Sequence, residues 1–311
     1  MSFITSTSAI FPYLYPGLYA SQMIYNMYDT EYSALYKKGY SNRAFEVFVH
    51  SKPLGAAPEK PEGTPTYIDD TRVMWQFSAA HKFFGTSFDI SYEAQRFNLY
   101  DRDYPQQLAQ LTNSHTQTRN YRAVEPLVNG FNTAAVTYDG QPLFSTQHPT
   151  AVGVYANTIG VPTQFEESAL EDIEISLAGM TDDAGNIISM SGSSVIVSPK
   201  NMFNAPRVLD NPDRPATTNR DINALYKLNR FPDGINVNHY LGNDWDDWYV
   251  KTRGGSAGLN DGGGALFLIA DELRIDPHAD EKTKIISFIS YESYMFVIWN
   301  NRQFFGVQGL S

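Results

Sequence analysis

Residues 139–149 read Asp139-Gly140-Gln141-Pro142-Leu143-Phe144-Ser145-Thr146-Gln147-His148-Pro149. The dipeptide Asp139-Gly140 is typical of a turn, and the apolar pair Leu143-Phe144 that follows it suits burial. Ser145, Thr146 and His148 supply the hydroxyl and imidazole groups from which a nucleophile and its base are made. The stretch therefore has two interpretations, a catalytic cluster or a structural loop.

The catalytic interpretation has little support in the surrounding sequence. A serine nucleophile needs a base that a carboxylate orients, and that carboxylate would have to come from elsewhere in the chain. Ser145 also lacks the Gly-x-Ser-x-Gly elbow of many hydrolases. Short hydroxyls commonly cap turns and bond to the backbone of their own loop. We therefore favour a structural role for Ser145, Thr146 and His148, and expect no catalytic residues and no enzyme.

The composition limits the classes of protein that the chain fits. It has 311 residues, of which 42% are hydrophobic, enough for one large domain or two ordinary ones. It has no cysteine, which excludes disulfides, thiolate nucleophiles and cysteine-bound zinc. The net charge of -11 argues against tight binding of nucleic acid, because such affinity comes mainly from neutralising phosphates.

Two further sequence features concern membranes and export. The N-terminus lacks a positively charged stretch before its apolar residues, so we expect no secretory signal. No run of about 18 apolar residues exists, so we expect no transmembrane helix and no membrane partner. The chain is expected to be made in the cytoplasm.

Residues 1–42 are rich in tyrosine. Tyr25, Tyr28, Tyr32 and Tyr36 follow helical spacing, and the cations and glycine of residues 37–39 predict a helix end there. Two interpretations remain open. The tyrosines belong to an amphipathic helix on the chain's own core, or to an arm across a neighbouring subunit, since tyrosine is enriched at interfaces.

Residues 43–80 have the pattern of a long β-hairpin. Apolar side chains recur at every second position of both strands, at Phe45, Val47, Val73, Trp75 and Phe77. Residues 53–65 between the strands hold four prolines and two glycines, which cannot continue a ladder. A hairpin of this length is poorly stable alone, so we expect its apolar face to lie on the domain body or on an adjacent subunit.

The rest of the chain mixes helices and strands. We expect a long helix over 104–131 with Pro126 near its end, and a helix that a Thr163–Glu166 capping box starts and that runs through Met180. Another helix is expected from Pro199. The expected strands are 194–198, 235–237, 248–250, 265–269, 285–290 and 295–299. Interleaved helices and strands without a clean linker predict an α+β fold.

Two other segments have a possible binding chemistry. His239, Asp244, Asp246 and Asp247 carry groups that bind metals, but their spacing fits no known signature and the neighbouring tryptophans suggest a packed strand. Residues 254–264 are glycine-rich but lack the Lys-Ser/Thr and helix start of a phosphate loop. We therefore expect no metal site and no cofactor.

Several of these motifs resemble those of one protein family. Residues 139–149 resemble the "DG-x-x-LFST-x-HP" loop of tailed-phage major capsid proteins, particularly the Mu-like major head subunits. Residues 244–249 resemble the "D-x-W-Y/F" strand of the same subunits, and Val197-Ser198-Pro199 before a helix is a further similarity. The order of elements is similar to the Hong Kong 97-type capsid fold over nearly the whole chain.

The resemblance implies a division of the chain. Residues 1–42 correspond to the N-terminal arm and 43–80 to the extended hairpin called the E-loop. Residues 81–161 correspond to a peripheral domain with a spine helix over 104–131. Residues 162–241 correspond to the axial domain, and 242–311 supply the remaining axial and peripheral strands.

The resemblance also implies a function. The chain would be a major capsid protein that assembles in the host bacterial cytoplasm, as hexamers and pentamers, into an icosahedral virion shell. The shell would enclose DNA without sequence-specific binding, and its further partners would be scaffold, portal and decoration proteins. The candidate inter-subunit contacts are Tyr25, Tyr28, Tyr32, Tyr36, Phe45, Val47, Val73, Trp75 and Phe77.

Three alternatives remain open at this stage. An encapsulin has the same fold but encloses cargo proteins rather than DNA. A hydrolase with dispersed catalytic residues would show no local motif. A β-rich module that binds carbohydrate or protein is suggested by the 20 tyrosines and 4 tryptophans.

Overall fold

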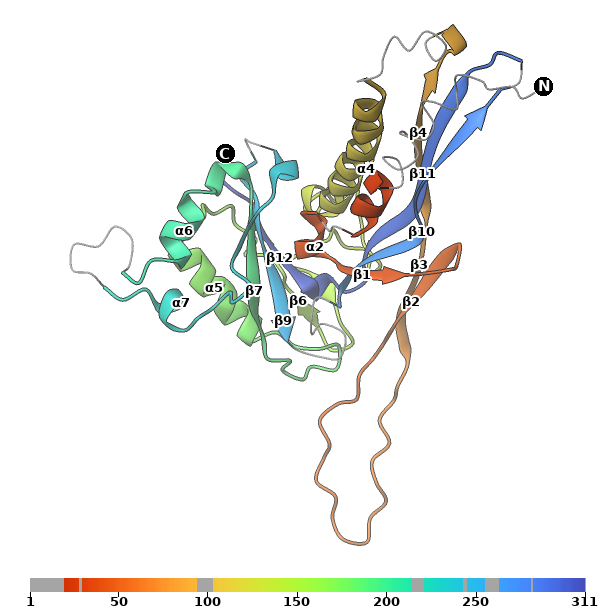
Figure 1. The fold of residues 1–311 in the computed structure, drawn as a ribbon. Helices are drawn as coiled ribbons and strands as arrows, with labels where there is room; N and C mark the ends of the chain where they lie inside the picture. Colours follow the sequence, from red (N-terminus) through yellow and green to blue (C-terminus); the bar gives the residue numbers. More distant parts are fainter. Residues whose placement is uncertain are drawn as a thin grey trace.

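A computed structural model describes residues 20–27, 30–93, 103–213, 221–242, 245–254, 263–280 and 282–310. The fold is α+β, as the sequence predicts, and is built on two four-stranded sheets (Figure 1). None of the helices in these residues is long and apolar enough to cross a membrane.

The first sheet has the strand order β1-β10-β11-β4. Its strands are β1 (Lys37–Tyr40), β10 (Ala265–Ala279), β11 (Ile286–Ile298) and β4 (Lys82–Ile90). β1 runs parallel to β10, and the other pairs are antiparallel. The expected strands at 285–290 and 295–299 are one continuous strand, β11, because Glu292 and Ser293 between them are buried and pair with β4.

The second sheet has the order β12-β9-β7-β8. Its strands are β12 (Phe304–Val307), β9 (Trp248–Gly254), β7 (Met190–Val197) and β8 (Ile235–Val237). The helices α5 (Glu167–Ala178), α6 (Asn204–Leu209) and α7 (Ala224–Lys227) pack on it. Short elements complete this part: β5 (His148–Pro149), β6 (Val154–Tyr155) and the 3-10 turns η1 (Pro199–Asn201), η2 (His239–Leu241) and η4 (Asn301–Gln303).

The long helix α4 (Asp103–Val128) lies beside the first sheet, as Figure 1 shows. It ends three residues before the predicted position 131, two residues after Pro126, which supplies no backbone N–H. Gly130, two residues after the end of α4, has no room for a side chain, because a Cβ there would lie 2.4 Å from the Phe144 ring. The helix exit and the 139–149 loop therefore pack directly against each other.

The predicted helix through Tyr25, Tyr32 and Tyr36 is wrong in its second half. Residues 20–27 are helical, α2 (Tyr32–Leu35) is a separate short helix, and residues 37–39 belong to β1 instead of a helix end. Packing overrides the helical spacing here, because Leu35 and both later tyrosines are buried in the core cluster that contains Phe267 of β10. Tyr28 lies outside the described residues.

The predicted capping box at Thr163 is also wrong. α5 begins at Glu167, and its N-cap residue Glu166 makes no side-chain cap bond. The Thr163 hydroxyl donates to the Val161 carbonyl, and its backbone N–H donates to Gln308. The Trp248 indole N–H, on β9, donates to the Thr163 carbonyl. Thr163 therefore bonds to the C-terminal part of the chain and does not cap a helix.

The hairpin consists of β2 (Phe45–Ser51) and β3 (Val73–Ala80), which pair antiparallel as predicted. Its tip, residues 52–72, extends away from the body (Figure 1). β4 follows β3 after the single residue His81, and the sequence analysis did not identify it. The hairpin is therefore joined directly to an edge strand of the first sheet.

Candidate functional site

The loop at residues 139–149 forms a buried polar network. The His148 ring is fully buried, with Nδ1 2.6 Å from Asp139 Oδ2 and Nε2 3.1 Å from Asn157 Oδ1. Asn301 Nδ2 donates to Asp139 Oδ2 at 3.2 Å. Burial alone would raise the pKa of Asp139, but the hydrogen bond and charge of His148 hold it below its usual value.

The same network joins the loop to the C-terminal part of the chain. The Asn157 amide donates to the carbonyls of Leu143 and Asn301, at 2.7 and 2.9 Å. The Phe144 ring lies so close to β12 that a Cβ on Gly306 would be 2.5 Å from it. The loop therefore fixes the end of α4 against the second sheet, which explains its mixture of polar and apolar residues.

The structure does not assemble a nucleophile and base from Ser145, Thr146 and His148. The Ser145 hydroxyl lies 3.4 Å from the Gln141 side-chain oxygen and accepts from the Gln147 backbone N–H. Both ring nitrogens of His148 face the partners named above, Asp139 and Asn157. The geometry supports the structural interpretation of the loop.

The candidate metal-binding side chains each interact with a different partner. His239 Nδ1 lies 2.8 Å from Glu31, Asp246 pairs with Lys200, and Asp247 accepts from the Gly309 backbone N–H. Asp244 lies outside the described residues, as does most of the glycine-rich 254–264 segment. No group of three or more metal-binding side chains occurs in the part of the chain that the structure describes.

The hairpin has two different faces. On the inner face Phe77 stacks on Phe48 at 5.1 Å between ring centroids and on Tyr138 of the body at 5.5 Å. On the outer face Phe45 is 56% exposed and Val47 is 44% exposed. The outer face therefore carries an apolar strip on β2 that the described residues leave exposed.

The nine predicted contact residues fall into three groups. Phe45, Val47 and Val73 are exposed, whereas Trp75 and Phe77 are half-buried. Tyr25, Tyr32 and Tyr36 are buried in the chain's own core, as the first interpretation of the tyrosine pattern expects, although they do not belong to one helix. Tyr28 is outside the described residues. Among the described candidates, Phe45, Val47 and Val73 are therefore the side chains most exposed to a neighbour.

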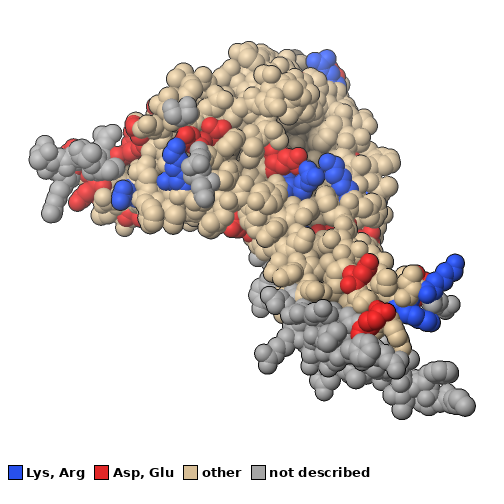
Figure 2. Space-filling view, turned by 90° about the horizontal axis from the view of Figure 1, so that it is seen from above, with Lys and Arg blue, Asp and Glu red and all other residues tan. Residues whose placement is uncertain are grey.

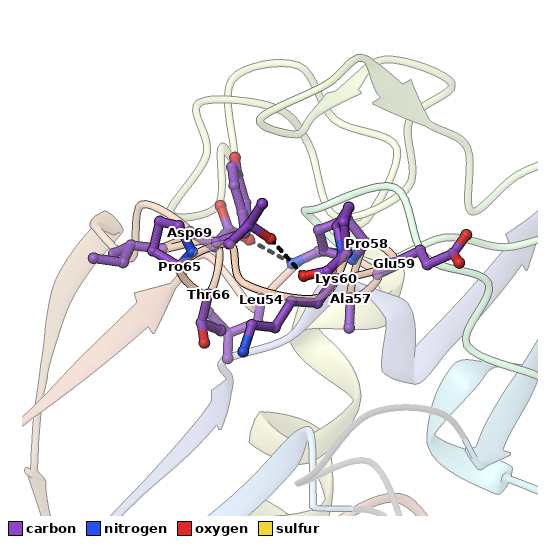
Figure 3. A pocket seen from close by; sticks show the side chains of 14 residues that line it. Leu54, Ala57, Pro58, Glu59, Lys60, Pro65, Thr66 and Asp69 are labelled. Carbon is purple, nitrogen blue, oxygen red and sulfur yellow. Dashed lines mark hydrogen bonds between the residues drawn. The ribbon is translucent and has the colours of Figure 1, made fainter.

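The hairpin tip encloses an open pocket of about 680 Å³ (Figure 3). Asp69 joins the two sides of the tip, because it accepts from the Gly55 backbone N–H at 2.7 Å and from Lys52 at 3.2 Å. Those bonds, the Gly55 bond first, lower the pKa of Asp69. Tyr67 and Ile68 on the rim are 67% and 89% exposed, so the tip adds further uncovered apolar surface.

A buried ionic cluster escaped the sequence analysis. Glu292 on β11 is fully buried and lies 2.8 Å from His115 and 2.5 Å from Arg119, both on α4. The Tyr25 hydroxyl donates to the same carboxylate at 3.0 Å. A single carboxylate inside an otherwise uncharged strand was the available signal, because such residues are rarely buried unless paired. The cluster joins the 20–27 helix, α4 and the first sheet.

Comparison with known proteins by sequence gives no match to any family model or curated protein. Solved structures do match. A virus-like particle from Pyrococcus furiosus is similar with a TM-score of 0.57 and 8% identity, over 94% of this chain and 98% of that one. A chain of Mycobacterium phage Patience is similar with a TM-score of 0.54 and 12% identity, over 96% of this chain and 87% of that one. The capsid of a native GTA particle is similar with a TM-score of 0.52 and 8% identity, over 92% of this chain and 92% of that one.

These similarities extend over nearly the full length of the chain and of each compared structure. The chain therefore has the Hong Kong 97-type capsid fold, which confirms the fold class expected from the sequence.

Proposed function

We propose that this chain is the major capsid protein of a tailed phage or prophage, of the Mu-like kind, and forms an icosahedral shell around DNA. The observation that carries the proposal is the projecting hairpin, whose strip of Phe45, Val47 and Val49 is uncovered in a single chain. Isolated exposed apolar residues are ordinary, but a contiguous strip on a projecting element is typical of a protein interface. The capsid fold and the 139–149 motif support the same function.

The geometry suggests how copies would associate. Val73 at the start of β3 and Tyr67 and Ile68 in the tip are exposed as well, and the tip extends away from the body (Figure 1). A neighbouring copy in a hexamer or pentamer would cover them, and interfaces of such permanent assemblies commonly exceed about 2,000 Å². We infer that the shell is located in the virion, with scaffold, portal and decoration proteins as further partners.

The division of labour within the chain is part of the proposal. The first sheet with α4 would be the peripheral domain, and the second sheet with α5, α6 and α7 the axial domain. The strands after residue 241 serve both, since β10 and β11 lie in the first sheet and β9 and β12 in the second. This agrees with a division in which residues 242–311 complete both domains.

The test is assembly of the purified protein, followed by sizing and electron microscopy. We expect pentamers, hexamers or shells. Val47→Ser should weaken assembly while leaving the thermal unfolding of the subunit nearly unchanged, because the side chain is exposed on the outer face. Val154→Ser, also at an exposed strand valine, is the matched control. Trp75→Ala is less decisive, because Trp75 is half-buried opposite His50 and its loss would also disturb the subunit.

Two outcomes would contradict the proposal in different ways. A folded chain that stays monomeric at high concentration would contradict any shell function. Shells isolated from the native host that hold protein cargo instead of DNA would favour the encapsulin alternative.

A further inference from the structure

Two histidines lie where the hairpin joins the body. His50 is on β2. Its ring stacks on Tyr138 with the ring centroids 4.5 Å apart, and the Trp299 ring lies tilted to it at 5.1 Å. His50 Nε2 faces the Trp299 carbonyl oxygen, which can only accept, so Nε2 carries a hydrogen and donates it. His50 is only 8% exposed, so its imidazole is part of the contact between the hairpin and the body; the hairpin is called seated while this contact is made.

The charged groups around His50 come from three segments of the body. They are Asp139 of the motif loop, Asp183 of the turn after α5, and Arg302 of η4. Arg302 already donates to Asp183 at 2.8 Å, so the acidic group beside the histidine has its own cation. Burial is the main cause that lowers the pKa of His50, and Arg302 also lowers it. The hydrogen bond to the Trp299 carbonyl and the two carboxylates raise it, but burial outweighs them.

His81 is the single residue between β3 and β4. Its backbone N–H donates to the Ala44 carbonyl and closes the base of the hairpin. Both of its ring nitrogens are buried, and neither has a hydrogen-bond partner among the described residues. A protonated ring would therefore have two N–H groups without an acceptor, whereas water would satisfy both if the base opened.

The charges that face His81 are Glu46 of β2 and Asp271 of β10. Glu46 is already engaged by the Ser41 hydroxyl at 2.6 Å and by Arg43 at 3.4 Å. Burial lowers the pKa of His81 more than these two carboxylates raise it. Both histidines, His81 at the base of the hairpin and His50 near the tip end of β2, thus favour the neutral ring while the hairpin is seated.

We propose that His50 and His81 make the seating of the hairpin on its own body sensitive to pH, so that mild acid releases the hairpin. The proposal concerns contacts within one chain and does not depend on shell assembly.

The direction follows from proton uptake. An exposed histidine has an ordinary pKa of about 6.5, and both seated histidines have lowered values. Below pH 6.5 the released state therefore binds more protons than the seated state. The stabilisation of the seated hairpin is fully present above about pH 6.5 and is lost as the pH falls from there toward the lowered values.

The test measures a distance within one chain. The natural sequence has no cysteine, so nitroxide labels can be placed at Gln76→Cys on β3 and Ile175→Cys on α5, both exposed. Labelled protein is diluted with unlabelled protein so that only distances within a chain are recorded. Pulsed electron spin resonance should give a narrow distribution at pH 7.5 and a shifted, broader one at pH 5.5.

Two variants decide whether the histidines cause the change. The pair His50→Gln and His81→Gln cannot titrate, and the glutamine at position 50 keeps an N–H for the Trp299 carbonyl. We expect the pH 7.5 distribution to persist in that variant at pH 5.5. His278→Gln, at an exposed histidine of β10, should respond like the natural chain. An unchanged natural chain at pH 5.5, or an equal change in the double variant, would overturn the proposal.

A second measurement covers the case in which the double variant does not fold. The natural sequence contains six histidines. With isotope-labelled histidine, the titration of each imidazole ring can be followed by nuclear magnetic resonance. The single variants His50→Gln and His81→Gln assign two of the signals. Both assigned rings should titrate below pH 6.5, and midpoints at or above 6.5 would overturn the proposal.

Discussion

At the scale of single residues, Glu292 is the most constrained charge described above. Its carboxylate is fully buried and bonded to groups from α4 and from the 20–27 helix. The Tyr25 hydroxyl is held in this cluster as a neutral donor, because burial first, and then Glu292, raise its pKa far above the usual value, while Arg119 opposes the rise. A buried ion pair contributes little net stability, but removing one member leaves the other charge without compensation.

Glu292→Gln should therefore be strongly destabilising. Arg119 would stay charged and buried without its carboxylate, and we expect a loss of about 3–5 kcal/mol in the free energy of unfolding. Chemical denaturation measures it. The control is Glu125→Gln, which removes an exposed pair with Arg122 and should cost under about 1 kcal/mol. Similar losses in the two variants would show that burial does not set the cost.

The contact between Phe144 and Gly306 gives a second prediction at this scale. Gly306→Ala would place a Cβ 2.5 Å from the Phe144 ring, so the loop or β12 must move. We expect a loss of about 1–3 kcal/mol by thermal denaturation, the usual cost of overpacking. Gly153→Ala is the control, because no atom lies within 4 Å of its Cβ position. Equal stability of the two variants would mean that the motif loop does not depend on this contact.

At the scale of elements, the hairpin tip should respond to assembly. Glu59 and Glu62 are exposed in a segment without regular structure, so a protease that cuts after glutamate should cleave there early in free subunits. In shells we expect protection, because the proposed function covers the tip with a neighbouring copy. A variant with glutamine at both positions shows which cuts belong to the tip. Equal cleavage rates in free subunits and shells would contradict docking of the tip.

The same scale shows what local sequence patterns can predict. The alternation in β2 and β3 and the period of Leu170, Ile173 and Leu177 in α5 predict these elements, since each buries one face of a regular structure. The pairing of Lys37 with Leu266 is not predictable this way, because it depends on a partner far along the chain. The Glu292 cluster is another case, since its cations lie on a helix distant in sequence.

At the scale of the whole molecule, the charge balance predicts weak contact with DNA. The net charge is -11, and the face in Figure 2 intermixes acidic and basic side chains instead of showing one basic area. At physiological salt the repulsion of phosphates is confined to about 8 Å. In the proposed shell, an inner surface of similar charge would hold packaged DNA without binding it tightly.

Titration of a DNA duplex with subunits or empty shells at about 0.15 M salt tests this charge argument. We expect no binding as tight as micromolar. A repeat at about 0.02 M salt is the control, because any residual phosphate contacts would strengthen there. Micromolar binding with a steep salt dependence would reveal a clustered basic face and contradict the charge argument, although the proposed shell function would remain.

The parallel pairing of β1 with β10 has a consequence for protein synthesis. A ribosome makes about 5–20 residues per second, so β1 waits roughly 10 to 45 seconds before its partner strand, which begins at Ala265, is made. β12, which completes the second sheet, is made later still. The first sheet cannot close before β10 and β11 have been made, and the second cannot close before β12 has been made. A growing polypeptide therefore cannot present a finished subunit to its neighbours, and translation itself delays association until the chain can fold.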